Sequence, residues 1–273
     1  MSNLVNASAE LLSQLRKKKP LVHNITNYVT VNDCANIILA IGASPIMADD
    51  IEEITDITAI SASLVLNIGT LNKRTVEAML AAGKRANELG IPVVLDPVGA
   101  GASTLRNKTT NLILSEVEVS VVRGNMSEIS FIAGLRSNTK GVDAAEEDIF
   151  SGDARKIASA VAEKWSCVTA ITGAIDVISD GKRLAAVSNG HRLLSNVTGT
   201  GCMSTALVGS FCGAGKDAFV AATGGIAAMG IAGEIAYEMA GDRGTGSYHI
   251  SIIDAISRLD EKMLVERAKI NEI

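Results

Sequence analysis

The chain has 273 residues, and its 25 basic and 30 acidic side chains give a formal net charge of −5. Hydrophobic residues make up 47% of the sequence but aromatic residues only 3%, so an aliphatic core is expected. Such a chain lacks the positive field and the stacking surfaces that bind nucleic acid or anionic lipid. No linker or repeat divides the sequence, and we predict a single domain over residues 1–273.

Helices and strands alternate along the first half of the chain. Apolar runs of strand length occur at 21–25, 44–47, 64–68 and 93–96. Helical spacing is found at 6–18, 30–41, 49–56 and 72–89. End signals support two of these helices, because Gly42 follows the second and Asn72 precedes the fourth.

The second half continues this alternation as far as residue 188. Helices are predicted at 104–115, from Asn125 onward and at 153–164, with a loop and helix start over 143–153. Strands are predicted at 117–122 and 167–172 and, as a hairpin joined by Asp180-Gly181, at 176–179 and 183–188. From Thr200 onward only helices are expected. This order predicts a three-layer α/β/α sandwich around a mostly parallel central sheet.

The cysteines and the long apolar stretches bear on the compartment. The four cysteines are scattered without a CxxC pair, and residues 1–9 are polar and do not resemble a signal peptide. Both features favour a reduced, cytoplasmic protein. The stretch 218–240 contains four glycines and two glutamates, so it is expected to be a buried helix and not a membrane span.

The segment 196–206, Asn-Val-Thr-Gly-Thr-Gly-Cys-Met-Ser-Thr-Ala, is the strongest functional signal. Gly199, Thr200 and Gly201 open a helix, whose first N–H groups and dipole form an anion site. Cys202 falls in the first helical turn, where the pKa of a thiol is expected to be lowered. An anion site with a base or positioning group beside it suits phosphoryl transfer to an alcohol.

Polar residues at predicted strand ends supply further candidates. Asp96 and Glu128 are hard oxygen ligands suited to Mg²⁺, although Asp96 could instead cap a turn and Glu128 could form a capping box with Asn125. Arg123 could bind a nucleotide phosphate or form a surface ion pair. Thr172 ends another strand and is a weak signal alone.

Two positions near the N-terminus are ambiguous. Asn24 and its neighbour His23 are polar in an apolar setting, so they either bind local backbone or line a pocket for a small polar ligand. Met47 ends a short strand and could belong to the core or to a pocket wall. The other three cysteines, Cys34, Cys167 and Cys212, are expected to be small inert core residues.

Six segments together resemble the hydroxyethylthiazole kinase family over about residues 10–260. They are 22–27, 32–36, 42–47, 96–100, 123–128 and 198–203. The last segment alone would indicate only the wider ribokinase-like superfamily, whereas the N-terminal segments are far more specific. Residues 136–153 are polar and irregular, and the resemblance does not extend to them.

The resemblance implies a ribokinase-like fold and a defined reaction. An ATP-dependent, Mg²⁺-requiring enzyme would phosphorylate the primary alcohol of 4-methyl-5-(2-hydroxyethyl)thiazole in thiamine salvage. The implied residues are Met47 and Gly199 for the substrate, Arg123 and Thr172 for ATP, Asp96 and Glu128 for the metal, and Cys202 in the place of the usual aspartate base. The family forms homotrimers with the thiazole site between subunits, so that Asn24 and Met47 would act on a neighbour's site.

Three alternatives compete with this interpretation. A hydroxymethylpyrimidine (phosphate) kinase shares the fold, but it resembles this chain poorly before residue 60. A nicotinamide-nucleotide hydrate dehydratase of the same fold usually has aspartate at the position of Cys202. A nucleotide-binding regulatory protein would need a broken site, whereas Asp96, Glu128, the glycines and Cys202 are all present.

Overall fold

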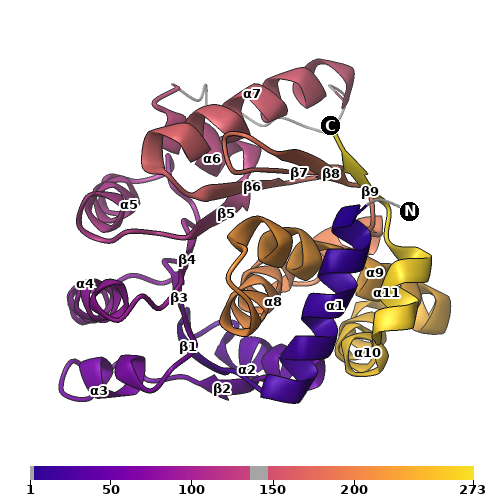
Figure 1. The fold of residues 1–273 in the computed structure, drawn as a ribbon, viewed down its shortest axis with the longest axis horizontal. Coiled ribbons are helices and arrows are strands. Elements are labelled where there is room, and N and C mark those ends of the chain that lie inside the picture. Colours follow the sequence, from indigo (N-terminus) through magenta and orange to yellow (C-terminus); the bar gives the residue numbers. More distant parts are fainter. Residues whose placement is uncertain (1–2, 136–146) are drawn as a thin grey trace.

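The structure is a computed structural model that describes residues 3–135 and 147–273, without the side chains of 147–153. Its centre is a nine-stranded sheet in the order β2-β1-β3-β4-β5-β6-β7-β8-β9 (Figure 1). The parallel strands are β1 (Leu21–Ile25), β2 (Ser44–Ile46), β3 (Ser63–Asn67), β4 (Val93–Asp96), β5 (Val121–Asn125) and β6 (Val168–Thr172). Three antiparallel strands complete the sheet: β7 (Asp176–Ser179), β8 (Leu184–Val187) and β9 (Ile270–Glu272).

Helices cover both faces of this sheet (Figure 1). One face carries α3 (Ile54–Ala59), α4 (Lys73–Glu88), α5 (Thr104–Glu116), α6 (Met126–Ala133) and α7 (Glu147–Trp165). The other carries α1 (Asn3–Lys18), α2 (Val31–Ile41), α8 (Thr200–Ala214), α9 (Ala218–Ala240), α10 (Thr245–Arg258) and α11 (Glu261–Arg267). A short 3₁₀ helix, η1 (Arg192–Asn196), precedes α8. The predicted three-layer sandwich with a mostly parallel sheet is therefore confirmed.

Each face of the sheet has its own hydrophobic core. Side chains of successive strand residues point to opposite faces, so Val65 of β3 packs in the core beneath α8 while Leu64 and Leu66 pack in the core beneath α4. Both cores consist mainly of Ala, Val, Ile and Leu. The interior strands are buried on both sides, which explains why they appear in the sequence as continuous apolar runs.

The helix α9 packs inside the molecule. It is long and apolar enough to cross a membrane, but 78% of its most apolar window is buried within the fold. A Cβ added at Gly225 would lie 2.8 Å from Cα of Val208, so glycine allows α9 to approach α8 closely. The helix is therefore a core element, as expected from its glycines.

Three element predictions were wrong. The strand expected at 117–122 is β5 at 121–125, because Val117 instead caps α5, where its N–H binds the carbonyl of Ile113. The acidic helix expected at 49–56 is α3 at 54–59, preceded by a turn. The region after Thr200 is not entirely helical, because β9 pairs with β8. Of the predicted loop and helix start at 143–153, residues 143–146 lie outside the described residues.

Candidate active site

The predicted functional residues meet along the carboxyl ends of the parallel strands. Asp96 ends β4 and lies opposite Asn67, which ends β3. Thr172 ends β6 and lies opposite Asn125 at the end of β5. Arg123 was predicted to follow a strand that ends at residue 122. The strand β5 instead runs from Val121 to Asn125, so Arg123 lies inside it. In open α/β sheets this edge is where ligands bind.

A buried polar network surrounds Cys202, in the first turn of α8. The side-chain amide of Asn67 donates to Asp96 Oδ2 over 2.8 Å and to Cys202 Sγ over 3.3 Å. The amide of Asn27 also donates to Cys202 Sγ over 3.3 Å. Thr205, one turn further along α8, donates its hydroxyl to Asp96 Oδ2 over 2.8 Å. The thiol and the carboxylate therefore belong to one hydrogen-bonded unit.

The environment of Asp96 raises the pKa of its carboxyl above the ordinary value. The side chain is only 1% exposed, and this burial raises its pKa to about 6. Arg123, whose Nη1 lies 3.9 Å from Asp96 Oδ2, acts in the opposite direction, and the nearby negative charge of Glu128 raises the pKa further. A buried carboxyl whose pKa is displaced by burial and by named charges is typical of functional sites.

Glu128 has the structural role that its spacing suggested. Its Oε2 accepts the N–H of Asn125, and the Asn125 side chain accepts the N–H of Glu128, which completes a capping box at the start of α6. Its Oε1 accepts the N–H of Gly99 over 2.8 Å and so fixes the turn after β4. Glu128 therefore joins the ends of β4 and β5.

The start of α8 requires glycine at position 199 and is tightly packed at Gly201. Gly199 has a φ of +85°, and a Cβ there would lie 2.7 Å from Cγ2 of Thr30. A Cβ on Gly201 would lie 2.8 Å from Nη1 of Arg123. The Thr200 hydroxyl donates to the carbonyls of Leu194 and Val197, so this side chain anchors the loop. Helix geometry leaves the first N–H groups of α8 free to bind an anion.

The prediction that the pKa of Cys202 is lowered was wrong. Burial raises the pKa of this thiol, and the negative charge of Asp96 raises it further, which outweighs the hydrogen bonds from neighbouring side chains. Proximity to a helix N-terminus is therefore insufficient to favour a thiolate here. The other three cysteines are buried, as predicted, and burial raises the pKa of Cys212 to about 12.

The two predicted ATP-binding residues contact each other. Arg123 Nη2 donates to the Thr172 hydroxyl over 2.6 Å. Arg123 Nε is buried without a partner in the described part of the protein, so the guanidinium retains an unused donor. This cation lies beside the glycine loop and the Asp96 carboxylate, at a place where phosphate groups could bind.

Asn24 and Met47 line a hollow at the carboxyl ends of β1, β2 and β3, with a volume of about 170 Å³. Its walls are formed by Asn24, Thr26, Tyr28, Val31, Met47, Asp49, Thr70, Asn72 and Thr75. His23 binds Thr58 and the carbonyl of Ala48, whereas both polar atoms of the Asn24 side chain are buried without a partner among the described residues. The local-backbone interpretation thus fits His23, and the pocket interpretation fits Asn24.

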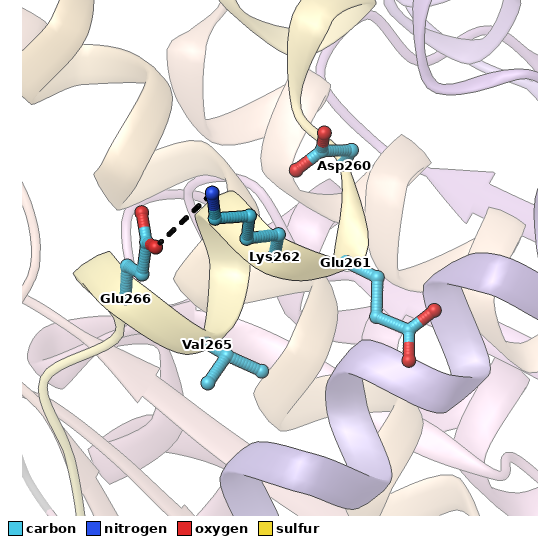
Figure 2. A pocket seen from close by; sticks show the side chains of 5 residues that line it. All are labelled: Asp260, Glu261, Lys262, Val265 and Glu266. Atoms are coloured by element: carbon cyan, nitrogen blue, oxygen red, sulfur yellow. Dashed lines mark ion pairs between the residues drawn. The ribbon is translucent and has the colours of Figure 1, made fainter.

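A second hollow lies elsewhere. Figure 2 shows it on α11, lined by Asp260, Glu261, Lys262, Val265 and Glu266. Lys262 lies 3.9 Å from Glu266, and both side chains are largely exposed. These residues belong to a single short helix and its cap, and none follows a parallel strand. This surface lacks the convergent polar groups found around Cys202.

Sequence reasoning missed Asn27, Asn67 and Thr205 as members of the site. Asn67 carried a usable signal, because it is a polar residue that ends an otherwise apolar strand, as Asp96 does. Asn27 and Thr205 gave no comparable signal. Their contacts with Cys202 and Asp96 depend on the packing of α8 against the sheet.

Comparison with solved structures defines the class of protein. Pyridoxal kinase from Staphylococcus aureus in complex with AMP-PCP superposes with a TM-score of 0.61 at 16% identity, over 93% of this chain and 99% of that one. At this identity the likeness concerns the fold alone. The fold is ribokinase-like, as the sequence resemblance predicted.

Closer relatives identify the family. Residues 12–262 match the sequence profile of the hydroxyethylthiazole kinase family. Hydroxyethylthiazole kinases of Ruminiclostridium cellulolyticum and Clostridium beijerinckii are 67% and 63% identical over the full length of both chains. The structure of hydroxyethylthiazole kinase from Pyrococcus horikoshii OT3 superposes with a TM-score of 0.89 at 42% identity, over 97% of this chain and 98% of that one. The chain belongs to the hydroxyethylthiazole kinase family.

Proposed function

We propose that this protein transfers the γ-phosphoryl group of ATP to the primary alcohol of 4-methyl-5-(2-hydroxyethyl)thiazole, a step of thiamine salvage. Family membership supports this activity, because relatives up to 67% identical over the whole chain carry the name of that enzyme. The alternative, a hydroxymethylpyrimidine kinase, is favoured by none of these relatives. ATP as the donor follows from the kinase family.

The arrangement of the site supports a division into two halves. The hollow around Asn24 and Met47 would take the thiazole, because it places the side chains of Met47 and Val31 in one wall with an unpaired buried amide. Arg123 in β5 and Thr172 in β6, three and four strands away from Asn24 in β1, would bind the phosphates of ATP. The loop from Gly199 to Cys202 contacts residues of both halves, through Thr30 and Asn27 on one side and Arg123 on the other.

The position of Cys202 is the observation that best supports this proposal. This residue lies at the N-terminus of α8, and hydrogen bonds from the side-chain amides of Asn27 and Asn67 fix the position of its sulfur. Because its pKa is raised, Cys202 remains a protonated thiol at neutral pH and acts by orienting the alcohol, while the proton of the alcohol passes to an oxygen of the transferred phosphoryl group. A loose phosphoryl transition state requires little help from a base, so positioning and charge neutralisation provide most of the catalysis. The N–H groups of residues 199–201 would stabilise the charge on the transferring group.

Asp96 and Glu128 are the proposed residues for Mg²⁺. No group of three or more His, Cys, Asp or Glu side chains is arranged to hold a metal within residues 3–135 and 147–273. Such a sparse site fits an ion that keeps several waters and binds chiefly to substrate phosphates. The negative charge of Glu128 raises the pKa of Asp96, so a cation bound between the two carboxylates would relieve their repulsion. Glu128 already accepts two backbone N–H groups, so it suits contact through water.

We also propose a cytoplasmic homotrimer with the thiazole site between subunits. Tyr28 lines the hollow and yet is 79% exposed, and Val29 beside it is also exposed. A second copy of the chain that packed there would close the hollow and bury both side chains. Sedimentation equilibrium tests this assembly: a trimer is expected, and a monomer at micromolar concentration would contradict it.

The activity is tested with purified protein, Mg-ATP and either the hydroxyethylthiazole or hydroxymethylpyrimidine. ADP and the phosphorylated alcohol are measured together. Selective formation of thiazole phosphate is the expected result. Formation of pyrimidine phosphate would keep the fold and the mechanism but overturn the substrate, and absence of both products would overturn the kinase assignment.

A further inference from the structure

Asn67 occupies the centre of the polar network around Cys202. Its side chain is 2% exposed, and all of its hydrogen-bonding capacity is used. Its Nδ2 donates to Asp96 Oδ2 over 2.8 Å and to Cys202 Sγ over 3.3 Å. Its Oδ1 accepts from Asn27 Nδ2 over 3.0 Å and from the N–H of Gly69 over 2.9 Å. One carboxamide therefore joins the turn after β1 with β3, β4 and α8.

Two other side chains in the network each hydrogen-bond either the Asp96 carboxylate or the Cys202 sulfur, but not both. Thr205 binds the Asp96 carboxylate but not the sulfur, whereas Asn27 binds the sulfur but not the carboxylate. In the part of the chain that the structure describes, Asn67 is the residue whose side chain hydrogen-bonds both. Its two N–H groups lie between two electron-rich atoms that repel each other when both are charged.

The direction of these bonds fixes the chemistry of the sulfur. Cys202 Sγ receives N–H groups from Asn67 and Asn27, so in these contacts it is an acceptor and its own hydrogen is not used. The Thr30 side chain is a further hydrogen-bonding neighbour of the sulfur. Deletion of Asn67 would leave a buried carboxylate and a thiol without a shared donor.

We propose that Asn67 is a positioning residue, which holds the Cys202 sulfur and the Asp96 carboxylate in one arrangement and separates them with its two N–H groups. The role in turnover rests on the proposed function. Asn67 touches no reacting atom itself and acts through Cys202 and Asp96. It ends β3 at the same level as Asp96 ends β4, so the register of the sheet sets its position.

The test uses Asn67→Asp, which keeps the shape but replaces the donor by an acceptor, and Asn67→Ala. The first measurement needs no substrate: alkylation of Cys202 by iodoacetamide is followed against pH, and the modified peptide is identified by mass spectrometry. The midpoint should move upward by about one pH unit or more, which is a tenfold loss of thiolate at a fixed pH. The shift should be larger for Asn67→Asp, which adds a negative charge.

Thr205→Val is the matched control. It removes a hydrogen bond to the same carboxylate but leaves the sulfur contacts intact, so the midpoint should stay or move downward. An upward shift equal to that of Asn67→Ala would assign the effect to Asp96 alone and overturn the proposal.

The second measurement is the steady-state rate with the thiazole. We expect kcat of the Asn67 variants to fall about tenfold or more, while KM for ATP changes less than about twofold. A folded variant with an unchanged alkylation midpoint and unchanged kcat would contradict the proposal. If Asn67→Asp fails to fold, Asn67→Ser gives both readouts. Absence of thiazole phosphate with the wild-type protein would overturn the proposed function, while alkylation still decides whether Asn67 governs Cys202.

Discussion

The guanidinium of Arg123 and the hydroxyl of Thr172 are joined by a hydrogen bond of 2.6 Å across two neighbouring parallel strands. The contact orients a cation whose Nε has no partner among the described residues, and it holds that cation beside the glycine loop of α8. A planar guanidinium can bind a hydroxyl and a phosphate at once, which a single ammonium group does less well.

Arg123→Lys should therefore raise KM for ATP about tenfold, because a charge-assisted hydrogen bond is lost while the charge is kept. Initial rates at varied ATP and saturating thiazole provide the measurement. Arg85→Lys, at an exposed arginine of α4 paired with Glu88, is the control and should leave KM unchanged. Equal KM values for the wild type and Arg123→Lys would exclude Arg123 from the nucleotide site.

Cys202→Ser should lower kcat about tenfold or more and leave KM for ATP nearly unchanged, because the site loses a group that faces the alcohol. Steady-state kinetics with both substrates varied provide the measurement. Cys212→Ala is a matched control in the same helix, since Cys212 is buried ten residues beyond Cys202 in α8. If Cys202→Ser turned over at the wild-type rate, neither a base nor a positioning role would remain.

Gly199→Ala should destabilise the fold more than Gly134→Ala. The two glycines have nearly the same φ, +85° and +86°, so an alanine meets similar backbone strain of about 1 kcal/mol at each. Only at Gly199 would the added methyl group also collide with Thr30, because no described atom lies within 4 Å of a Cβ at Gly134. Urea denaturation gives the free energy of unfolding of each variant. Equal decreases for the two variants would show that the Thr30 side chain moves aside without cost.

Asp176 should make stability depend on pH in the neutral range. Burial raises the pKa of this carboxyl from 3.8 to about 7. Between these values the folded state keeps a proton that the unfolded state has released, so the contribution of Asp176 to stability decreases as pH rises. Asp176→Asn carries no charge and can still accept the N–H of Gly173. Relative to the wild type, it should gain about 2 kcal/mol between pH 5 and pH 8.

Asp217→Asn is the control for this pH dependence. Hydrogen bonds from Arg183, at 2.7 and 2.9 Å, hold the pKa of Asp217 below its ordinary value, so this carboxyl is ionised throughout the neutral range. The difference between this variant and the wild type should therefore stay constant from pH 5 to pH 8. Urea denaturation at each pH gives both curves, and parallel curves for Asp176→Asn would refute the effect.

Local sequence signals predicted most of the fold. Gly42 at a helix end and Asp180-Gly181 in a hairpin act within a few residues, and the structure has them where expected. The strand expected at 117–122 failed because Val117 and Val119 are buried in a connection, and burial alone resembles a strand. The strand β9 gave no signal because it exists only through pairing with β8, some 85 residues earlier in the chain.

The sequence predicted the strand-end residues of the candidate site but not the contacts between them. Residues at strand ends, such as Asp96, could be expected to gather at one edge of a parallel sheet. Asn67 could not be connected with Cys202, because the two are 135 residues apart and meet only when α8 packs on the sheet. The raised pKa of Cys202 also depends on that packing, since burial is its main cause.

The first helix is anchored almost entirely to the last quarter of the protein. Lys18 donates to the carbonyl of Ala214, and Arg16 donates to three carbonyls of residues 256–259. Within the sequence, α1 precedes these partners by about 200 residues. During synthesis the apolar side of α1 therefore stays uncovered until α8 and the segments after it have emerged.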